Sequence, residues 1–444
     1  MSFAFTAHIN ARHKVLRFSP KFALATLVGL LCTTALADAP LTLHGAQQRA
    51  VERSRLLVAK DYAALASREM AVAAGQLPDP VLRIGVDNLP IEGPDRFSLT
   101  RDFMTQRRVG LMQDLTRADK RRLRAERFER EAEKSSAEKT ATTATIQRDT
   151  AVAWLDRYYS EAMAAVVAEQ TDQAKLEIQA AEAAYRSGRG NQADFFNARS
   201  SLVMLDDRAS EIGRRVSNAK VLLARWIGDA AQLSLGGKPA IDVIRLDAAT
   251  LETDLQHHPE IAVLGKQEEL AATEAKLAQA NKKADWSVEL AFMQRGSAYS
   301  NMVSVGVSVP LQWNQKNRQD RELTSRLAQV EQAKAEREDA LRAHVAEVRA
   351  MINEWQNSRE RHARYQQELV PLANSRTMAS LAAYRGGKAP LTEVLASRRN
   401  QIDVRLQALQ LEADTARLWA QLNFLFPRDS ASAHPAVWMN QDSK

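Results

Sequence analysis

The chain has 444 residues, a formal charge of +7, a single cysteine and a mean hydropathy of −0.37. A chain of this length normally contains more than one domain, and one cysteine excludes an internal disulfide framework. Beyond the N-terminal region no run approaches about 18 consecutive apolar residues, so the sequence predicts no transmembrane helix there.

Residues 1–37 have the pattern of an export signal. Four basic residues precede the apolar run Phe22–Leu31, and Ala35–Ala37 fits a cleavage site. The alternative is a short buried helix. Leu31 precedes Cys32, where a lipid-anchored protein needs a small residue, so we expect cleavage after Ala37 without lipidation. The mature chain would carry +3 and no cysteine, which gives little support for a nucleic-acid partner, and we expect none.

The remaining sequence contains an internal repeat. AAYRSGRGNQADFFNAR at 183–199 returns as AAYRGGKAPLTEVLASR at 382–398, and VGLMQDL from Val109 resembles VGVSVPL from Val305. Chance similarity between alanine-rich helices is the alternative, but the order helix, strands, long helix, turn, helix is also kept. We therefore predict one repeat at 38–235, a second at 236–428 and a tail at 429–444.

Each repeat contains a long helical stretch. Residues 116–187 contain neither proline nor glycine, and a continuous helix of that length would measure about 108 Å. Residues 314–385 contain a single proline, Pro371, and no glycine. This proline should kink or interrupt the second helix. Helices this long need a partner along their length, so we expect coiled-coil packing.

Each long helix should end in a tight turn. Gly188 and Gly387 stand where a left-handed C-cap is favoured, and a returning helix follows, so each copy is the tip of a helical hairpin. Asp194 and Glu393 fall in the first turn of the returning helices. The helix macrodipole favours a carboxylate there, and this alone could explain both acids.

Four segments alternate with the period of strands, around 81–88, 105–115, 285–294 and 302–311. One face is apolar, and the other carries small or charged residues. A soluble sheet packed on a helix gives the same pattern, but these strands are flanked end-on by long helices. Because closing a barrel takes about eight strands, a membrane-spanning version requires an oligomer that shares one barrel.

These features resemble the TolC family of bacterial outer-membrane efflux ducts. The resemblance covers about residues 41–427 and depends on the repeat, two strands per half, and the tips Tyr185–Gly188 and Tyr384–Gly387. It implies a mainly α fold with a small β part: duplicated helical hairpins form an α-barrel, and each protomer of a homotrimer gives four strands to a twelve-stranded transmembrane β-barrel. The implied partners are outer-membrane lipid, a periplasmic adaptor protein and an inner-membrane pump of the RND type.

The resemblance also implies roles for residues at the tips. Asp194, Glu393 and Tyr384 would form a periplasmic gate, with Tyr384 hydrogen-bonded to Asp194 across neighbouring hairpins. Ala389 departs from the family pattern, because a basic lock residue can stand there. Adaptor contacts would come from the tip residues Tyr185, Gly188, Gly387 and Leu391, although hairpin packing would explain them equally well.

Residues 78–90 and 107–115 resemble the heavy-metal (CzcC/CusC-like) branch of the family, which exports metal cations. Thioethers suit soft ions, but we expect lipid or core packing for the methionines in or near the strands, Met104, Met112, Met293 and Met302. His257 and His258 are interpreted as surface residues. We expect no metal site and no cofactor in the chain.

No enzyme motif is present: the sequence has no phosphate-binding glycine loop, no HExxH spacing and no cysteine nucleophile. The predicted function is passive conduction through a gated pore, with energy supplied by the pump. Two alternatives stay open, a duct for drugs or secreted polypeptides and a soluble periplasmic coiled-coil scaffold.

Overall fold

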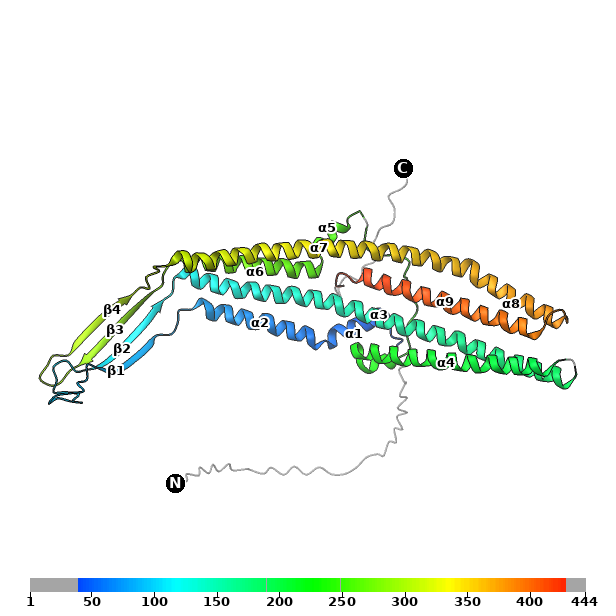
Figure 1. Ribbon diagram of the computed structural model, residues 1–444, viewed down its shortest axis with the longest axis horizontal. Helices are drawn as coiled ribbons and strands as arrows, with labels where there is room; N and C mark the ends of the chain where they lie inside the picture. Colours follow the sequence, from blue (N-terminus) through cyan, green and yellow to red (C-terminus); the bar gives the residue numbers. More distant parts are fainter. Residues whose placement is uncertain (1–38, 189, 248, 429–444) are drawn as a thin grey trace, which may run out of the picture. The chain divides into compact units, whose positions relative to one another are not determined.

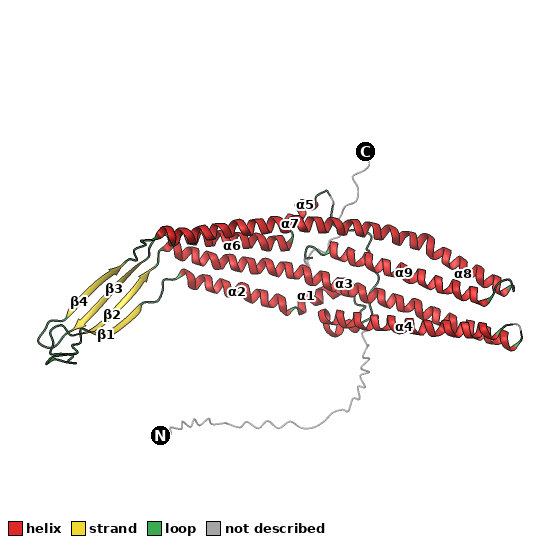
Figure 2. Cartoon of the chain, viewed as in Figure 1, coloured by secondary structure: helices red, strands yellow, loops and turns green. Residues whose placement is uncertain are grey.

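The computed structural model describes residues 39–428 apart from residues 189 and 248. The expected export signal and the expected tail at 429–444 lie outside the described residues. The described chain is mainly helical, with four strands in one sheet (Figures 1 and 2), which confirms the predicted fold class. None of the described helices combines the length and apolar composition needed to cross a bilayer.

The two halves present their elements in the same order. The first half contains α1 (Leu43–Arg53), α2 (Arg55–Gly75), β1 (Val81–Asp87), β2 (Gln106–Leu115), α3 (Ala118–Arg186) and α4 (Gln192–Ile227). The second contains α5 (Leu251–Gln256), α6 (Pro259–Asn281), β3 (Trp286–Gln294), β4 (Met302–Ser308), α7 (Gln319–Arg364), α8 (Val370–Arg385) and α9 (Leu391–Asn423). The repeat boundary near residue 235 stays a prediction.

Helix starts follow local capping chemistry. The hydroxyl of Thr42 accepts a hydrogen bond from Gly45 N at 3.0 Å at the start of α1, and Ser54 caps α2 in the same way. Such caps satisfy amides that have no partner within the helix. Pro259 occupies the first turn of α6, where its missing N–H costs nothing.

Helix α3 is the spine of the unit formed by residues 40–428. Its 69 residues span about 104 Å, and it packs against α2 and α4 of its own half and against α6 and α9 of the other. Ion pairs add to this packing: Lys60–Glu138 joins α2 to α3 at 2.6 Å, and Arg127 joins α3 to Glu274 of α6 at 2.8 Å. The two repeats are therefore held together along one shared helix.

The second long helix is not regular. Between α7 and α8 the residues Tyr365–Leu369 form a turn of π-helix, which ends two residues before Pro371. Proline has no N–H and its ring crowds the carbonyl four residues earlier, so a wider turn relieves the clash. The interruption predicted at Pro371 is thus a π-turn, while the matching helix α3 runs without a break.

The sheet is antiparallel throughout, in the order β1-β2-β3-β4. It lies beyond the ends of α2, α3, α6 and α7 (Figure 1), and no described helix packs on it. Strand β4 ends at Ser308 rather than near residue 311, because Pro310 cannot donate to the ladder.

The main core lies around the middle of α3, where the segment before α1 and the segment after α4 pack against it. Trp154 is fully buried, and its indole N–H donates to Leu41 O at 3.0 Å. Arg157 is 2% exposed and donates to Ala231 O at 2.7 Å and Leu233 O at 2.8 Å. A buried guanidinium needs such partners, so Arg157 fixes the segment that follows α4 against α3.

One expectation about histidine is wrong. His257 is exposed as expected, but His258 is 5% exposed and lies against the ring of His344, with centroids 4.2 Å apart. The extended backbone at this N-cap (φ −59°, ψ 137°) turns consecutive side chains in different directions, so neighbours in sequence need not share a surface. Burial, and to a lesser extent His344, lowers the pKa of His258 to about 4.

This histidine predicts acid sensitivity. In the unfolded chain His258 takes up a proton near pH 6.5, but in the folded chain only near pH 4. The contribution of neutral His258 to the free energy of unfolding is therefore fully present above pH 6.5 and is lost as the pH falls toward 4, by up to about 3 kcal/mol. We expect His258→Asn, which keeps a good N-cap, to reduce the drop in melting temperature between about pH 7.5 and about pH 4.5. His257→Asn is the matched control, and an unchanged drop in His258→Asn would contradict the assignment.

Candidate functional site

One face of the sheet is apolar over its central part, with Arg107, Gln113 and Gln294 toward its two ends. The register places Leu82 opposite Leu111 and Leu111 opposite Leu290, which in turn faces Val305. Residues paired across strands share a face, and every one of the following apolar residues of that face is exposed: Leu82, Ile84, Val86, Val109, Leu111, Leu290, Phe292, Val303, Val305 and Val307. Such a surface is larger than scattered apolar residues and marks an interaction site.

The opposite face carries a charge cluster. Glu289 contacts Arg108 and also Arg83 at 3.5 Å, and Arg108 lies 3.8 Å from Asp87. Gly110 makes room for this cluster, since a Cβ there would lie 3.3 Å from Glu289 Oε1 and 3.1 Å from the Cβ of Ala291. The sheet is therefore apolar on one side and charged on the other, with both sides uncovered.

The methionines differ from expectation. The register places Met112 and Met293 on the charged face, and Met302 is the partner of Met293. Met104 lies in the loop before β2. The methionines of the strands therefore do not lie on the apolar face, so the lipid- or core-packing role expected for them is not found there. Within the described chain no three His, Cys, Asp or Glu residues come together as a metal site.

Each outer strand of the sheet has one open edge. Among the described residues, strand β1 pairs only with β2, and β4 only with β3, so one side of each has unpaired backbone groups. Because directions alternate, β4 of one copy and β1 of a second copy can pair antiparallel without changing the pattern. Unpaired edges are not tolerated in hydrocarbon, whereas a closed ring removes them.

At the other end of the unit the two hairpin tips have the same backbone. Gly188 and Gly387 both have φ +69°, a conformation that glycine adopts at little cost. Gly188 N donates to Tyr185 O, and Gly387 N donates to Tyr384 O, both at 3.0 Å. The sequence therefore identified the tips correctly, and these glycines have a conformational role whatever they contact.

The tip acids occupy equivalent places. Asp194 lies in the first turn of α4, where its N–H donates to the capping Asn191 at 2.8 Å, and Glu393 lies in the first turn of α9. Glu393 is exposed and Asp194 half-buried. Tyr384 is half-buried, and in the described part of a single chain it forms no hydrogen bond with Asp194. The predicted link would thus need a neighbouring copy.

A small apolar cluster joins the tips. Leu391 and Val394 of the second hairpin are 3% and 0% exposed and pack with Ala181 and Ala198 of the first. For Leu391 this favours hairpin packing over the adaptor contact. Tyr185 is 48% exposed and remains available to a partner.

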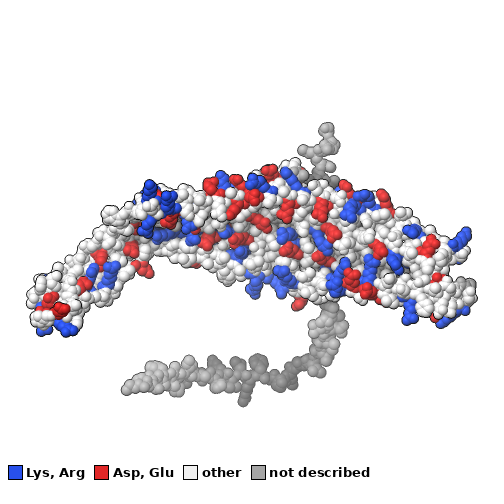
Figure 3. Space-filling model, viewed as in Figure 1, with Lys and Arg blue, Asp and Glu red and all other residues white. Residues whose placement is uncertain are grey.

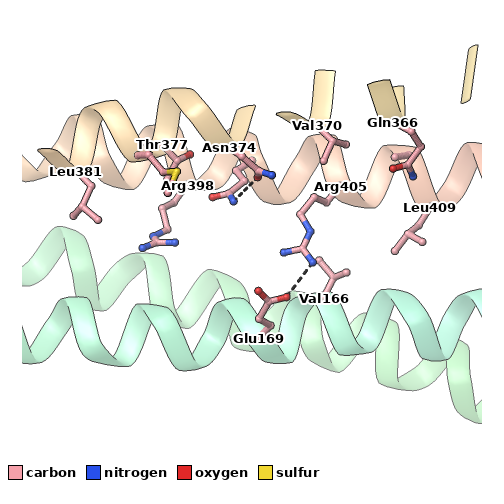
Figure 4. A pocket seen from close by; sticks show the side chains of 13 residues that line it. Val166, Glu169, Gln366, Val370, Asn374, Thr377, Leu381, Arg398, Arg405 and Leu409 are labelled. Atoms are coloured by element: carbon pink, nitrogen blue, oxygen red, sulfur yellow. Dashed lines mark hydrogen bonds and ion pairs between the residues drawn. The ribbon is translucent and has the colours of Figure 1, made fainter. Parts of the chain in front are cut away.

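Ion pairs between the hairpins are contacts that sequence reasoning missed. Arg398 of α9 contacts Glu177 of α3, Arg405 lies 3.0 Å from Glu169, and Arg208 of α4 lies 2.5 Å from Asp403. The Arg405–Glu169 pair crosses a groove of about 780 Å³ between α3, α8 and α9 (Figure 4). The repeat offered a hint, since Arg398 is the counterpart of Arg199, but only the fold shows its partner.

Comparison with known proteins supports the fold. Residues 252–426 match the family described as outer membrane efflux protein, while a comparison with curated proteins finds no significant match. Similar solved structures include VceC of Vibrio cholerae, an outer membrane protein (18% identity, TM-score 0.70, covering 86% of this chain and 95% of VceC). The CmeC outer membrane channel of Campylobacter jejuni is similar as well (11%, 0.72, covering 93% and 94%).

A third similar structure is CusC, described in connection with transmembrane channel formation (14% identity, TM-score 0.72, covering 87% of this chain and 92% of CusC). The chain therefore has the fold of outer-membrane channels over nearly its whole described length, and residues 252–426 match the outer membrane efflux protein family in sequence. CusC and CmeC have equal TM-scores, so the comparisons do not separate the heavy-metal branch from the others.

The two faces of β4 predict opposite responses to charge. Val305→Arg places a cation on the apolar face and should prevent stable membrane assembly, since such a residue costs about 2–4 kcal/mol at the bilayer midplane in each copy. The neighbouring Ser304→Arg, on the charged face, should assemble normally. The measurement is the amount of assembled protein in purified membranes, and equal amounts for both variants would contradict the assignment of faces.

Proposed function

We propose that this chain is the outer-membrane exit duct of a tripartite efflux system. Three copies would close a twelve-stranded barrel, with the helices forming a periplasmic tunnel. The observation that carries this proposal is the four-stranded sheet, which has an exposed apolar face and two open edges. A lipid environment covers the face, and pairing between copies satisfies the edges.

The proposed mechanism is passive conduction. An inner-membrane RND pump supplies the energy, and a periplasmic adaptor docks at the tips, where Tyr185 is exposed. Docking opens the duct only if the partner binds the open form more tightly than the closed one. In the protomer, the cluster around Val394 and the Arg398–Glu177 contact hold the two hairpins together, so they oppose any separation of the tips.

We further propose that Asp194 and Glu393 line the entrance, with Tyr384 linking neighbouring hairpins. The equivalent positions of the two acids support this proposal, because threefold symmetry would place six carboxylates at one narrow end. Such a ring would attract cations. For cargo we propose heavy-metal cations, on the similarity of residues 78–90 and 107–115 to that branch.

The duct is tested with purified mature protein. We expect a trimer by native mass and stepwise conductance in planar bilayers, because a protomer alone has too few strands to form a pore. A stable single chain that stays in water without pores would instead support the periplasmic scaffold.

The entrance acids predict a change in ion block. Asp194→Ala combined with Glu393→Ala should weaken block by multivalent cations and alter conductance, because the carboxylate ring is removed. The matched control is Glu182→Ala with Glu211→Ala. Each of these two carboxylates pairs with an arginine of its own helix, Glu182 with Arg186 and Glu211 with Arg215. Block that is equal in the wild type and the double variant would leave both acids as helix-terminal residues only.

The cargo is tested in the host organism. Deletion of the gene should reduce tolerance to copper, zinc or cobalt more than tolerance to detergents and dyes. Complementation with the Ser304→Arg variant should restore tolerance, and the Val305→Arg variant should not. Sensitivity to drugs alone would reverse the choice of cargo and leave the duct in place.

A further inference from the structure

The region where the strands meet the helices is strongly basic. It comprises the segments 76–80, 116–124, 281–286 and 309–322, which connect the sheet to α2, α3, α6 and α7. These segments hold ten Lys and Arg against five Asp and Glu, a net charge of +5, whereas residues 38–444 together carry +3. The rest of that chain is therefore net negative, and positive charge is concentrated at this basic junction (Figure 3).

Seven of these ten cations form no ion pair with a described residue, and five of the seven are exposed. Lys120 pairs with Asp285 at 2.9 Å, and Lys282 pairs with Asp320 at 2.9 Å. In contrast, five exposed residues form no ion pair with any described residue: Arg122, Lys283, Lys316, Arg318 and Arg321. Their charge is available to a ligand outside the chain.

The N-termini of two helices also favour an anionic ligand at the basic junction. Helices α3 and α7 both begin at the basic junction, and their N-cap residues, Arg117 and Arg318, make no side-chain cap hydrogen bond. The positive end of the macrodipole at such termini favours phosphate and other anions, although at α3 the Lys120 N–H already donates to Asp119 Oδ1 at 2.9 Å. The unpaired cations therefore stand beside backbone groups with the same preference.

The border of the apolar face identifies the ligand. Trp286 pairs with Leu115 at the helix-side end of that face, and Leu311 and Trp313 follow β4 with 64% and 87% exposure. Exposed tryptophan at the end of a lipid-facing strand is typical of the boundary between hydrocarbon and headgroups. A soluble anionic partner would not require this apolar border.

We propose that the basic junction binds the phosphate headgroups of anionic phospholipids in the leaflet that faces the periplasm. This inference rests on the proposed insertion of the sheet in the outer membrane. The cations lie beyond the tryptophans, on the helix side, which is the depth of the headgroups when the apolar face occupies the hydrocarbon. The site would anchor the duct at a fixed depth.

The test measures which lipids the assembled protein retains. Wild type and the variant Arg122→Gln, Lys316→Gln, Arg318→Gln are exchanged into equal amounts of phosphatidylcholine and phosphatidylglycerol, and the retained lipids are counted by native mass spectrometry. We expect wild type to prefer phosphatidylglycerol and the variant to lose at least about fivefold of that preference, the effect of one Lys or Arg near an anionic surface.

The matched control is Arg214→Gln, Arg349→Gln, Arg376→Gln, which removes three exposed, unpaired cations far from the junction in sequence and should keep the wild-type preference. Retention of both lipids in the bath ratio by wild type, or an equal preference in wild type and junction variant, overturns the proposal. If the junction variant does not assemble, wild type decides, because its preference must weaken as salt rises.

Conductance of the same preparations separates this inference from the duct. Pores without any preference for phosphatidylglycerol refute the lipid site alone. Absence of pores in wild type refutes the proposed function itself.

Discussion

An uncovered apolar sheet with two free edges is the constraint on which the rest of the structure depends. Four strands hold their internal ladder but leave β1 and β4 half-paired, and the side chains of one face are exposed without a helix above them. Neither problem can be solved inside one protomer. The proposed assembly in a membrane would solve both, because lipid would cover the face and neighbouring strands would satisfy the edges.

The helical part serves this assembly through length rather than through a large core. Helix α3 reaches from the sheet to the tip, and both halves pack against it. Apolar contacts dominate around Trp154 and recur in smaller clusters toward the tip, while ion pairs such as Arg405–Glu169 lie between them. Exposed pairs contribute little stability, so the small clusters and the more buried Arg398–Glu177 pair decide how firmly the hairpins stay together.

Much of this architecture could be predicted because it follows from local patterns. Alternation of apolar and polar residues identified the strands. Gly188 and Gly387, each following a long helical stretch, identified the hairpin tips. Contacts between distant segments could not be predicted. Nothing in the sequence near His258 indicates His344 as its neighbour, and Arg398 and Arg199 look equivalent although only Arg398 meets Glu177.

The π-turn before Pro371 gives the two copies of the repeat different mechanics. A helix with an unbroken hydrogen-bond ladder resists bending evenly, whereas a π-turn and a proline concentrate bending at one level. Bending of the second hairpin should therefore concentrate at residues 365–371, whereas α3 has no such point along its 69 residues.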